Sequence, residues 1–217
     1  MSKEINQQMH NNPNFKKKII EEFGLTAQQV EYLEIYIKEI IKYNKHTNIV
    51  GKSTLLDPWK SHIFDSLQIT KFIQNKESSI LDMGTGAGLP GIVLSLQKYT
   101  NISLIDSNRK KINFINPLLK KLNISPKVYC ERIESLANLK FNYVVSRALS
   151  NLNKLFYYSQ NFLNQNSVMV FLKGKTAMTE ITEASKNWDF VYEKHQSISD
   201  KRGWVLVINN LQKKKHD

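Results

Sequence analysis

The chain has 217 residues, 41% of them hydrophobic, and its 31 Lys and Arg residues against 19 Asp and Glu give a formal net charge of +12. This length supports one sizeable core and excludes two ordinary domains joined by a linker. The positive charge favours an anionic partner such as a nucleic acid over an acidic small molecule, although a generally basic proteome would produce the same excess.

The sequence also excludes several other classes of protein. The single cysteine, Cys130, rules out a disulfide framework and fits a reducing compartment. The five histidines lack the close spacing that a metal site needs, so we expect no metal. Residues 1–12 are polar, unlike a secretory signal, and the longest weakly charged run, residues 80–96, is too short to span a bilayer. We therefore expect a cytoplasmic protein without a membrane anchor, and a monomer.

The first third of the chain predicts helices, which we interpret as an N-terminal helical extension over residues 1–77. Thr26 and Gln29 have the spacing of a capping box, and Gly24 is a typical helix stop just before it. The apolar residues that follow fall on one stripe at helical spacing, namely Val30, Leu33, Ile37, Ile40 and Ile41. The expected helices cover residues 14–23, 26–43 and 59–72.

From residue 78 to residue 217, short apolar runs alternate with amphipathic segments. Strands are expected at 79–83, 102–106, 127–130, 143–146, 168–172, 190–194 and 204–209. Helices are expected at 90–97, 109–122, 152–163 and 177–188, with Pro117 kinking or interrupting the second of them. The alternation predicts an α/β fold with a seven-stranded, mostly parallel sheet covered on both faces. Only a short loop joins the last two strands, which predicts an antiparallel pair at the sheet edge.

A glycine-rich segment, Asp82-Met-Gly84-Thr-Gly86-Ala-Gly88-Leu-Pro-Gly91, joins the first strand to its helix. Such a turn needs glycine for positive φ and for close approach of a ligand to the backbone. The run from Gly86 to Gly91 also spells the dinucleotide-binding pattern, so an NAD-dependent oxidoreductase is the alternative. Asp82 favours S-adenosylmethionine instead, because a carboxylate beside the glycines repels a diphosphate and suits a cationic ligand.

Three later segments fit the same pocket. Asp106 closes the second strand, where a carboxylate can accept hydrogen bonds from two ribose hydroxyls of either cofactor. After the third strand, Ile133 could pack on a purine while Glu134 reads its edge. Arg147 ends the fourth strand, which lies beside the first in this topology and so puts Arg147 at the mouth of the site. A solvated Glu134 and a surface ion pair for Arg147 explain these two residues equally well.

Together these motifs resemble the RsmG (GidB) family of bacterial 16S rRNA guanine-N7 methyltransferases. The likeness runs from about residue 31 to residue 174 and rests on the Asp82–Gly91 segment with, in order, Tyr43-Asn44-Lys45, Asn48, His62-Ile-Phe-Asp65-Ser66, Ser146-Arg147-Ala148, Leu152-Asn153 and Leu172-Lys173-Gly174. The resemblance implies a Rossmann-like class I methyltransferase fold, S-adenosylmethionine as cofactor, and 16S rRNA, the 30S subunit or an assembly intermediate as partner. It implies cofactor contacts at Gly84, Leu89, Ile133, Glu134 and Arg147.

The implied chemistry needs no general base, since guanine N7 already carries an in-plane lone pair. Catalysis is then a matter of positioning, for which Arg147 is the candidate, touching either the cofactor carboxylate or guanine O6. We expect His62 and Lys173 to line the substrate side. Basic clusters that could track RNA, or simply be solvated, lie at residues 16–18, 109–111, 120–121 and 213–215. Charge alone would equally fit an RNA-binding module without enzymatic activity.

Overall fold

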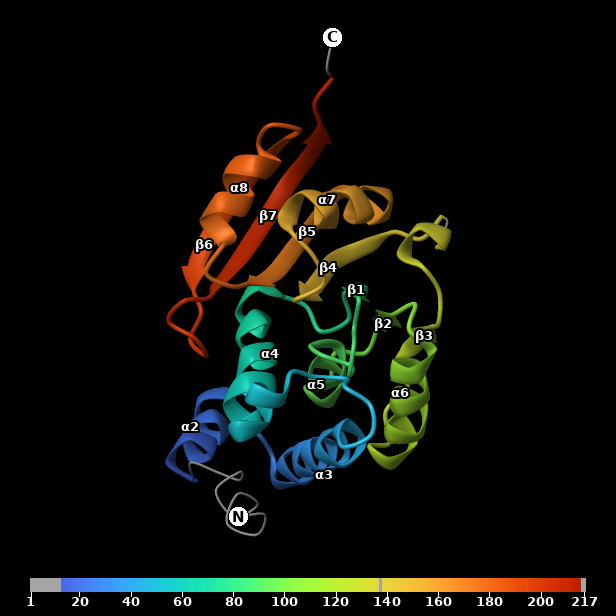
Figure 1. Ribbon diagram of the computed structural model, residues 1–217, viewed down its shortest axis with the longest axis vertical. Coiled ribbons are helices and arrows are strands. Elements are labelled where there is room, and N and C mark those ends of the chain that lie inside the picture. The colour runs from blue at the N-terminus through green and yellow to red at the C-terminus, as the bar shows by residue number, and fades with distance from the viewer. Residues whose placement is uncertain (1–12, 137, 216–217) are drawn as a thin grey trace.

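The structure is a computed structural model that describes residues 13–136 and 138–215. Its centre is a seven-stranded sheet in the order β3-β2-β1-β4-β5-β7-β6 (Figure 1). The first five strands are parallel, and β7 runs antiparallel to both β5 and β6. This confirms the predicted α/β class, the antiparallel pair at the edge, and the pairing of the fourth strand with the first. The strands are β1 (Ile80–Met83), β2 (Ile102–Ile105), β3 (Lys127–Tyr129), β4 (Phe141–Arg147), β5 (Leu163–Lys173), β6 (Trp188–Gln196) and β7 (Trp204–Lys213).

Helices cover both faces of the sheet, as the near-continuous apolar strands require. One face packs against α2 (Pro13–Phe23), α3 (Ala27–Asn44), α5 (Gly91–Leu96) and α6 (Arg109–Lys121), and the other against α7 (Leu152–Ser159) and α8 (Ala177–Ala184). The side chains of β1 alternate accordingly, with Ile80 in the first core and Leu81 and Met83 in the second. None of the helices in the described part of the chain is long and apolar enough to cross a membrane.

The predicted helix over residues 59–72 is a composite of three helical types. A π-helical segment (Trp59–Phe64) leads into one turn of α-helix, α4 (Asp65–Leu67), and then into a 3-10 segment (Gln68–Phe72). Further 3-10 turns cover Lys52–Leu56, Ile133–Ser135 and Gln160–Phe162. π-helical turns are rare and often occur at functional sites, which directs attention to the residues around position 62.

Helix α6 passes through Pro117 without a break, so Pro117 does not interrupt the helix, the second of the two predicted effects. Proline in a helix interior costs about 3 kcal/mol. The apolar side of α6 outweighs that cost, because each fully buried large side chain contributes roughly 1.5–3 kcal/mol. The buried residues on this side are Ile112, Phe114, Ile115, Leu118 and Leu119.

The N-terminal helices share a core with the sheet. The predicted capping box is present, with the Thr26 side chain accepting from the backbone of Gln29. From the same helix, the buried Tyr36 hydroxyl donates to the carbonyl of Ala87 at 2.8 Å, and the Gln29 amide donates to the carbonyl of Leu96 at 2.7 Å. Helix α3 is therefore hydrogen-bonded to the glycine-rich segment and to the end of the helix that follows it. The division into an extension (1–77) and a core (78–217) stays a prediction.

Candidate functional site

A cleft of about 1070 Å³ opens at the carboxyl ends of the central strands. Its walls come from segments far apart in the sequence, within residues 84–89 after β1, 147–150 at the end of β4, 172–174 at the end of β5, 49–61 in the N-terminal part, and 197–204 at the turn that joins β6 to β7. In an open parallel sheet, this is the edge at which ligands bind. The predicted site residues Gly84, Gly86, Leu89, Arg147 and Lys173 all lie on the wall of this cleft.

The three alternating glycines meet different needs, although all have positive φ (Gly84 +65°, Gly86 +61°, Gly88 +96°). A Cβ atom at Gly84 would lie 2.4 Å from Leu149, and one at Gly88 would lie 2.3 Å from Ile92. At Gly86 the nearest atom to such a Cβ would be 3.8 Å away. A side chain at Gly84 or Gly88 would therefore have to displace Leu149 or Ile92, whereas Gly86 leaves its backbone open toward the cleft.

Asp82 lies beneath the glycine-rich segment rather than at its surface. Its side chain is fully buried, and Oδ2 accepts hydrogen bonds from the Thr85 hydroxyl at 2.6 Å and from the Gly91 amide at 2.9 Å. Oδ1 has no hydrogen-bond partner among the described residues. Burial raises the pKa of this carboxyl to about 6, an effect that the two hydrogen bonds only partly offset. Asp82 therefore shapes the turn and keeps one acceptor atom unused.

This raised pKa predicts a pH-dependent stability. Because the folded state holds the Asp82 proton more tightly than the unfolded state does, ionisation destabilises the fold. The penalty is absent below about pH 4 and complete above about pH 6, the interval between the usual pKa of 3.8 and the raised one. Asp82→Asn should remove it, so the free energy of unfolding of the variant relative to the parent should rise by about 3 kcal/mol between these limits. Urea denaturation across that range measures this, and a difference independent of pH would contradict it.

Asp106 follows β2 and is already engaged with the glycine-rich segment. Its Oδ2 accepts from the Gly86 amide at 3.0 Å and from the Lys111 ammonium at 3.2 Å, while Oδ1 accepts from the Asn108 amide at 2.8 Å. Only about 7% of the residue is exposed. Lys111 itself lines the cleft. Asp106 thus fixes the position of the Gly86 backbone. A ligand could replace Lys111 as the donor to Asp106, since a lysine side chain is flexible.

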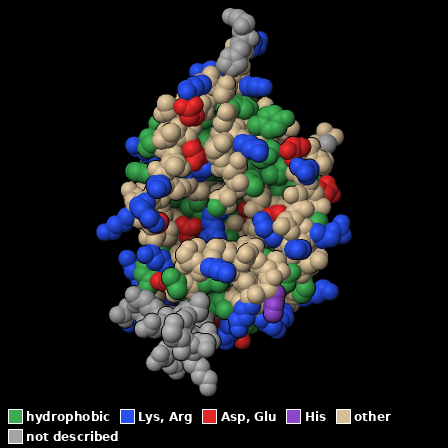
Figure 2. Space-filling model, in the orientation of Figure 1, with side chains coloured by type: hydrophobic (Ala, Val, Ile, Leu, Met, Phe, Trp, Pro, Cys, Tyr) green, Lys and Arg blue, Asp and Glu red, His purple; other side chains and the backbone are tan. Residues whose placement is uncertain are grey.

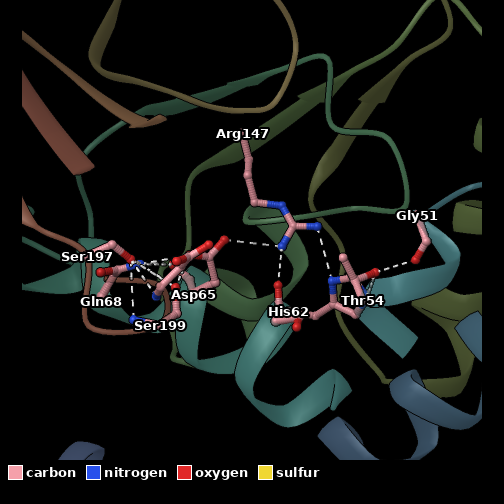
Figure 3. Close-up of polar contacts among 10 residues, drawn as sticks. Gly51, Thr54, His62, Asp65, Gln68, Arg147, Ser197 and Ser199 are labelled. Carbon is pink, nitrogen blue, oxygen red and sulfur yellow. Dashed lines mark hydrogen bonds and ion pairs between the residues drawn. The ribbon is translucent and has the colours of Figure 1, made fainter. Parts of the chain in front are cut away.

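Arg147 and Lys173 lie on the cleft wall but make internal contacts. One Nη of Arg147 donates to the Ser61 carbonyl at 2.8 Å and pairs with Asp65 Oδ2 at 3.4 Å (Figure 3). The Lys173 ammonium donates to the carbonyl of Ser150 at 2.7 Å and also forms a salt bridge with Glu180 of α8. Lys173 therefore secures the loop after β4, and its 7% exposed side chain has little room to contact a large substrate directly.

Besides Asp82, Gly88 and Asp106, which lie behind the wall, three further predicted site residues are not part of the cleft wall. His62 is completely buried behind Arg147, so it does not line the substrate side as expected. Ile133 is buried in the second core, and Glu134 is exposed beside it. Both follow β3, whose end pairs with the end of β2, and this places them next to the Asp106 side of the site. The burial of His62 could not be predicted from the sequence, which does not reveal the π-helical segment in which His62 lies.

The structure adds a polar network that sequence reasoning missed. Asp65 Oδ1 accepts from the Ser199 hydroxyl at 2.5 Å and from the Gln68 amide at 2.9 Å. The Gln68 amide also reaches the Ser197 hydroxyl at 3.2 Å, and its carbonyl oxygen accepts from the Ile198 amide at 3.0 Å. Figure 3 shows this network beside Arg147. His62-Ile-Phe-Asp65-Ser66 stood out as a motif, but nothing in the sequence connected it to the turn between β6 and β7.

A family model described as rRNA small subunit methyltransferase G (GidB) matches residues 29–205. The chain belongs to this family. It is 42% identical over 187 residues to the ribosomal RNA small subunit methyltransferase G of Rickettsia prowazekii, an alignment that covers 86% of this chain and 97% of the relative. The resemblance of the ordered motifs to this family is thereby confirmed, and the match extends beyond residues 31–174.

Solved structures with low sequence identity share the fold. A ribosomal protein L11 methylase from Lactobacillus delbrueckii subsp. bulgaricus superimposes with a TM-score of 0.56 at 17% identity, covering 67% of this chain and 76% of that one. The glycopeptide N-methyltransferase MtfA, complexed with S-adenosylhomocysteine, gives a TM-score of 0.57 at 8% identity, covering 67% and 88%. These likenesses confirm the Rossmann-like methyltransferase fold.

Within residues 13–136 and 138–215, no group of three or more His, Cys, Asp or Glu side chains could hold a metal ion.

Proposed function

We propose that this protein transfers a methyl group from S-adenosylmethionine to N7 of a guanine in 16S rRNA of the small ribosomal subunit. Family membership supports methyl transfer to small-subunit rRNA. The observation that carries the cofactor assignment is the open backbone of Gly86 at the cleft wall, with the Asp106 carboxylate beside it and the buried Asp82 carboxylate beneath the same turn. The alternative of an NAD-dependent oxidoreductase finds no support in these relatives.

The residues around the glycine-rich segment fit this cofactor. The Gly86 position allows close approach of a ligand to the backbone, and Asp106 offers carboxylate oxygens suited to ribose hydroxyls once the Lys111 contact yields. Gly84 and Leu89 complete this wall of the cleft. Ile133 and Glu134 would bound the adenine end, and Gly88 and Asp82 would act from beneath by holding the turn. When bound, the cofactor supplies an electrophilic methyl group.

The chain's own contribution would be orientation and exclusion of water. Guanine N7 is nucleophilic without deprotonation, so the site needs no general base. The common bidentate contact of arginine with guanine O6 and N7 would occupy the nucleophile, and the base must be held by other edges. Arg147, anchored at the cleft wall, would contact guanine O6 or the cofactor carboxylate with its remaining N–H groups.

Basic side chains around the cleft suit an RNA substrate. Lys60, Lys111 and Arg202 line it, and Figure 2 shows many further Lys and Arg side chains spread over this face of the molecule. Not all of the predicted basic clusters are available to phosphates, because Lys16, Lys121 and other members pair with carboxylates. An rRNA substrate would place the enzyme in the cytoplasm.

Mass spectrometry of small-subunit rRNA fragments tests this function. Small subunits or their rRNA, isolated from cells that lack the enzyme, should gain one methyl group at a guanine when incubated with protein and S-adenosylmethionine. Equilibrium dialysis should show binding of S-adenosylhomocysteine and no binding of NAD. The methylation rate should fall steeply from low to moderate salt, because phosphate contacts release counterions. Binding of NAD with no methylated guanine would overturn the proposal.

A further inference from the structure

A continuous chain of hydrogen bonds joins Arg147 to the N-terminal part of the cleft wall through His62 (Figure 3). The second Nη of Arg147 lies 3.1 Å from His62 Nδ1, and His62 Nε2 lies 3.1 Å from the Thr54 hydroxyl oxygen. That hydroxyl in turn donates to the Gly51 carbonyl at 2.6 Å. Gly51, Thr54 and Arg147 all line the cleft, whereas the imidazole between them is completely buried.

The donors and acceptors in this chain leave one protonation state for the histidine. A guanidinium group only donates, so His62 Nδ1 accepts and carries no proton. The Thr54 hydroxyl has a single hydrogen, which it gives to Gly51, so its oxygen accepts from His62 Nε2. The ring is therefore neutral with its proton on Nε2. Burial and the neighbouring Arg147 charge lower the pKa of His62 to about 3, which agrees with this assignment.

We infer that His62 is a positioning residue, held as the neutral Nε2–H tautomer, that fixes the Arg147 guanidinium and ties it to residues 51–54 across the cleft wall. With Ser61, Asp65 and His62 as acceptors, three of the five guanidinium N–H groups are engaged. Within the described ranges, the Nε–H and one Nη–H have no partner and are available to a ligand oxygen. The catalytic meaning of this arrangement rests on the proposed function.

The same contacts exclude two simpler roles for His62. A general base needs an accessible lone pair, and the only one on this ring is occupied by Arg147. A direct RNA contact needs an exposed edge, which a residue with 0% exposure lacks. Arg147 is the charged group beside the ring, and the guanidinium in turn interacts with the carboxyl groups of Asp65 and of the buried Asp82. The ion pair at this place is formed by the Arg147 guanidinium and the Asp65 carboxylate, and the neutral imidazole takes no part in it.

Side-chain NMR on the ¹⁵N-labelled full chain tests the tautomer without any activity assay. Long-range ¹H–¹⁵N correlations of His62 should show a protonated Nε2 and an unprotonated Nδ1, unchanged between about pH 5 and about pH 8. A proton on Nδ1, or titration of the ring within this interval, would overturn the inference. Because this measurement needs neither cofactor nor RNA, its result is independent of whether the protein methylates rRNA.

Two amide variants then separate the bonds made by the ring. His62→Asn places an oxygen where Nδ1 accepts from Arg147, whereas His62→Gln places an amide where Nε2 donates to Thr54. The Asn variant should lose about tenfold in kcat, because it lacks the bond to Thr54, while the Gln variant should lose roughly 100-fold in kcat with a small change in KM, as expected for a misplaced Arg147. Equal melting temperatures for the two variants would show that folding is not the cause.

Controls on both sides of His62 complete the test. Thr54→Ser, which keeps the hydroxyl, should retain activity, and Thr54→Val, which removes it, should lower kcat by about tenfold. His195→Asn changes an outlying histidine, 40% exposed, and should have no effect. Equal activity of the Asn and Gln variants at position 62 would overturn the positioning role. A parent enzyme that is inactive on rRNA would instead refute the proposed function and leave the NMR result standing.

Discussion

Replacing Arg147 with alanine should abolish methylation of small-subunit rRNA, with kcat/KM falling by at least roughly 1000-fold. The guanidinium is held at the cleft wall by Ser61, His62 and Asp65, and its side chain is only 16% exposed. Alanine removes both the ligand-facing N–H groups and the partner of a carboxylate. Single-turnover methylation assays with saturating cofactor measure the loss, and full activity of the variant would remove Arg147 from the site.

Arg147→Lys is the matched variant for this prediction. Lysine keeps the charge but cannot reproduce a planar fork that reaches three acceptors at once. We expect it to lose roughly 100-fold in kcat/KM, between the parent and the alanine variant. Circular dichroism and melting temperature should show that both variants fold, because the buried apolar cores on the two faces of the sheet are untouched.

Gly86→Ala should weaken binding of S-adenosylhomocysteine at least about tenfold, equivalent to about 1.4 kcal/mol, while the fold survives. A Cβ atom there meets nothing closer than 3.8 Å, so it would project into open space at the cleft wall and block a ligand from the backbone. The left-handed φ of +61° costs an L-residue only roughly 1–2 kcal/mol of stability. Isothermal titration with the product cofactor measures the affinity.

Gly91→Ala provides the contrast, since its added methyl group points inward. The new Cβ would lie 2.2 Å from a Leu104 methyl and 2.8 Å from Asp82 Oδ2. Overpacking of this kind costs typically about 1–3 kcal/mol of folding free energy. We therefore expect a clear fall in melting temperature for Gly91→Ala and a small one for Gly86→Ala. An unchanged affinity in a well-folded Gly86→Ala variant would contradict the placement of the cofactor.

Most of the fold was predictable because the apolar pattern, the caps and the turn residues agree with one another. Each of the seven predicted strands overlaps an observed one, although β5 begins at Leu163 and β7 continues to Lys213, beyond the predicted bounds. Thr26 caps α3 as its spacing to Gln29 indicated. Pro117 does not interrupt α6, because tertiary packing of the apolar side of the helix overrode a local preference. The predicted parallel order of β2, β1 and β4 was enough to place Asp82, Asp106 and Arg147 at the same edge of the sheet.

The polar contacts of the site were not predictable in the same way, because they join segments distant in sequence. Asp82 is adjacent to the glycines as expected, but only three dimensions reveal that it lies beneath them with one oxygen bonded to Thr85 and Gly91. His62 was expected to line the substrate side. Its π-helical turn instead buries it as a link between Arg147 and Thr54.

The network of Gln68 and Asp65 with Ser197 and Ser199 also has a bearing on biosynthesis. These partners are separated by 129 and 134 positions, so one half of each contact leaves the ribosome long before the other exists. A nascent chain can pair its first five strands in order of emergence, yet the wall of the cleft stays incomplete until the final hairpin docks. Competence to act on a ribosomal subunit is consequently among the last properties that each newly made molecule acquires.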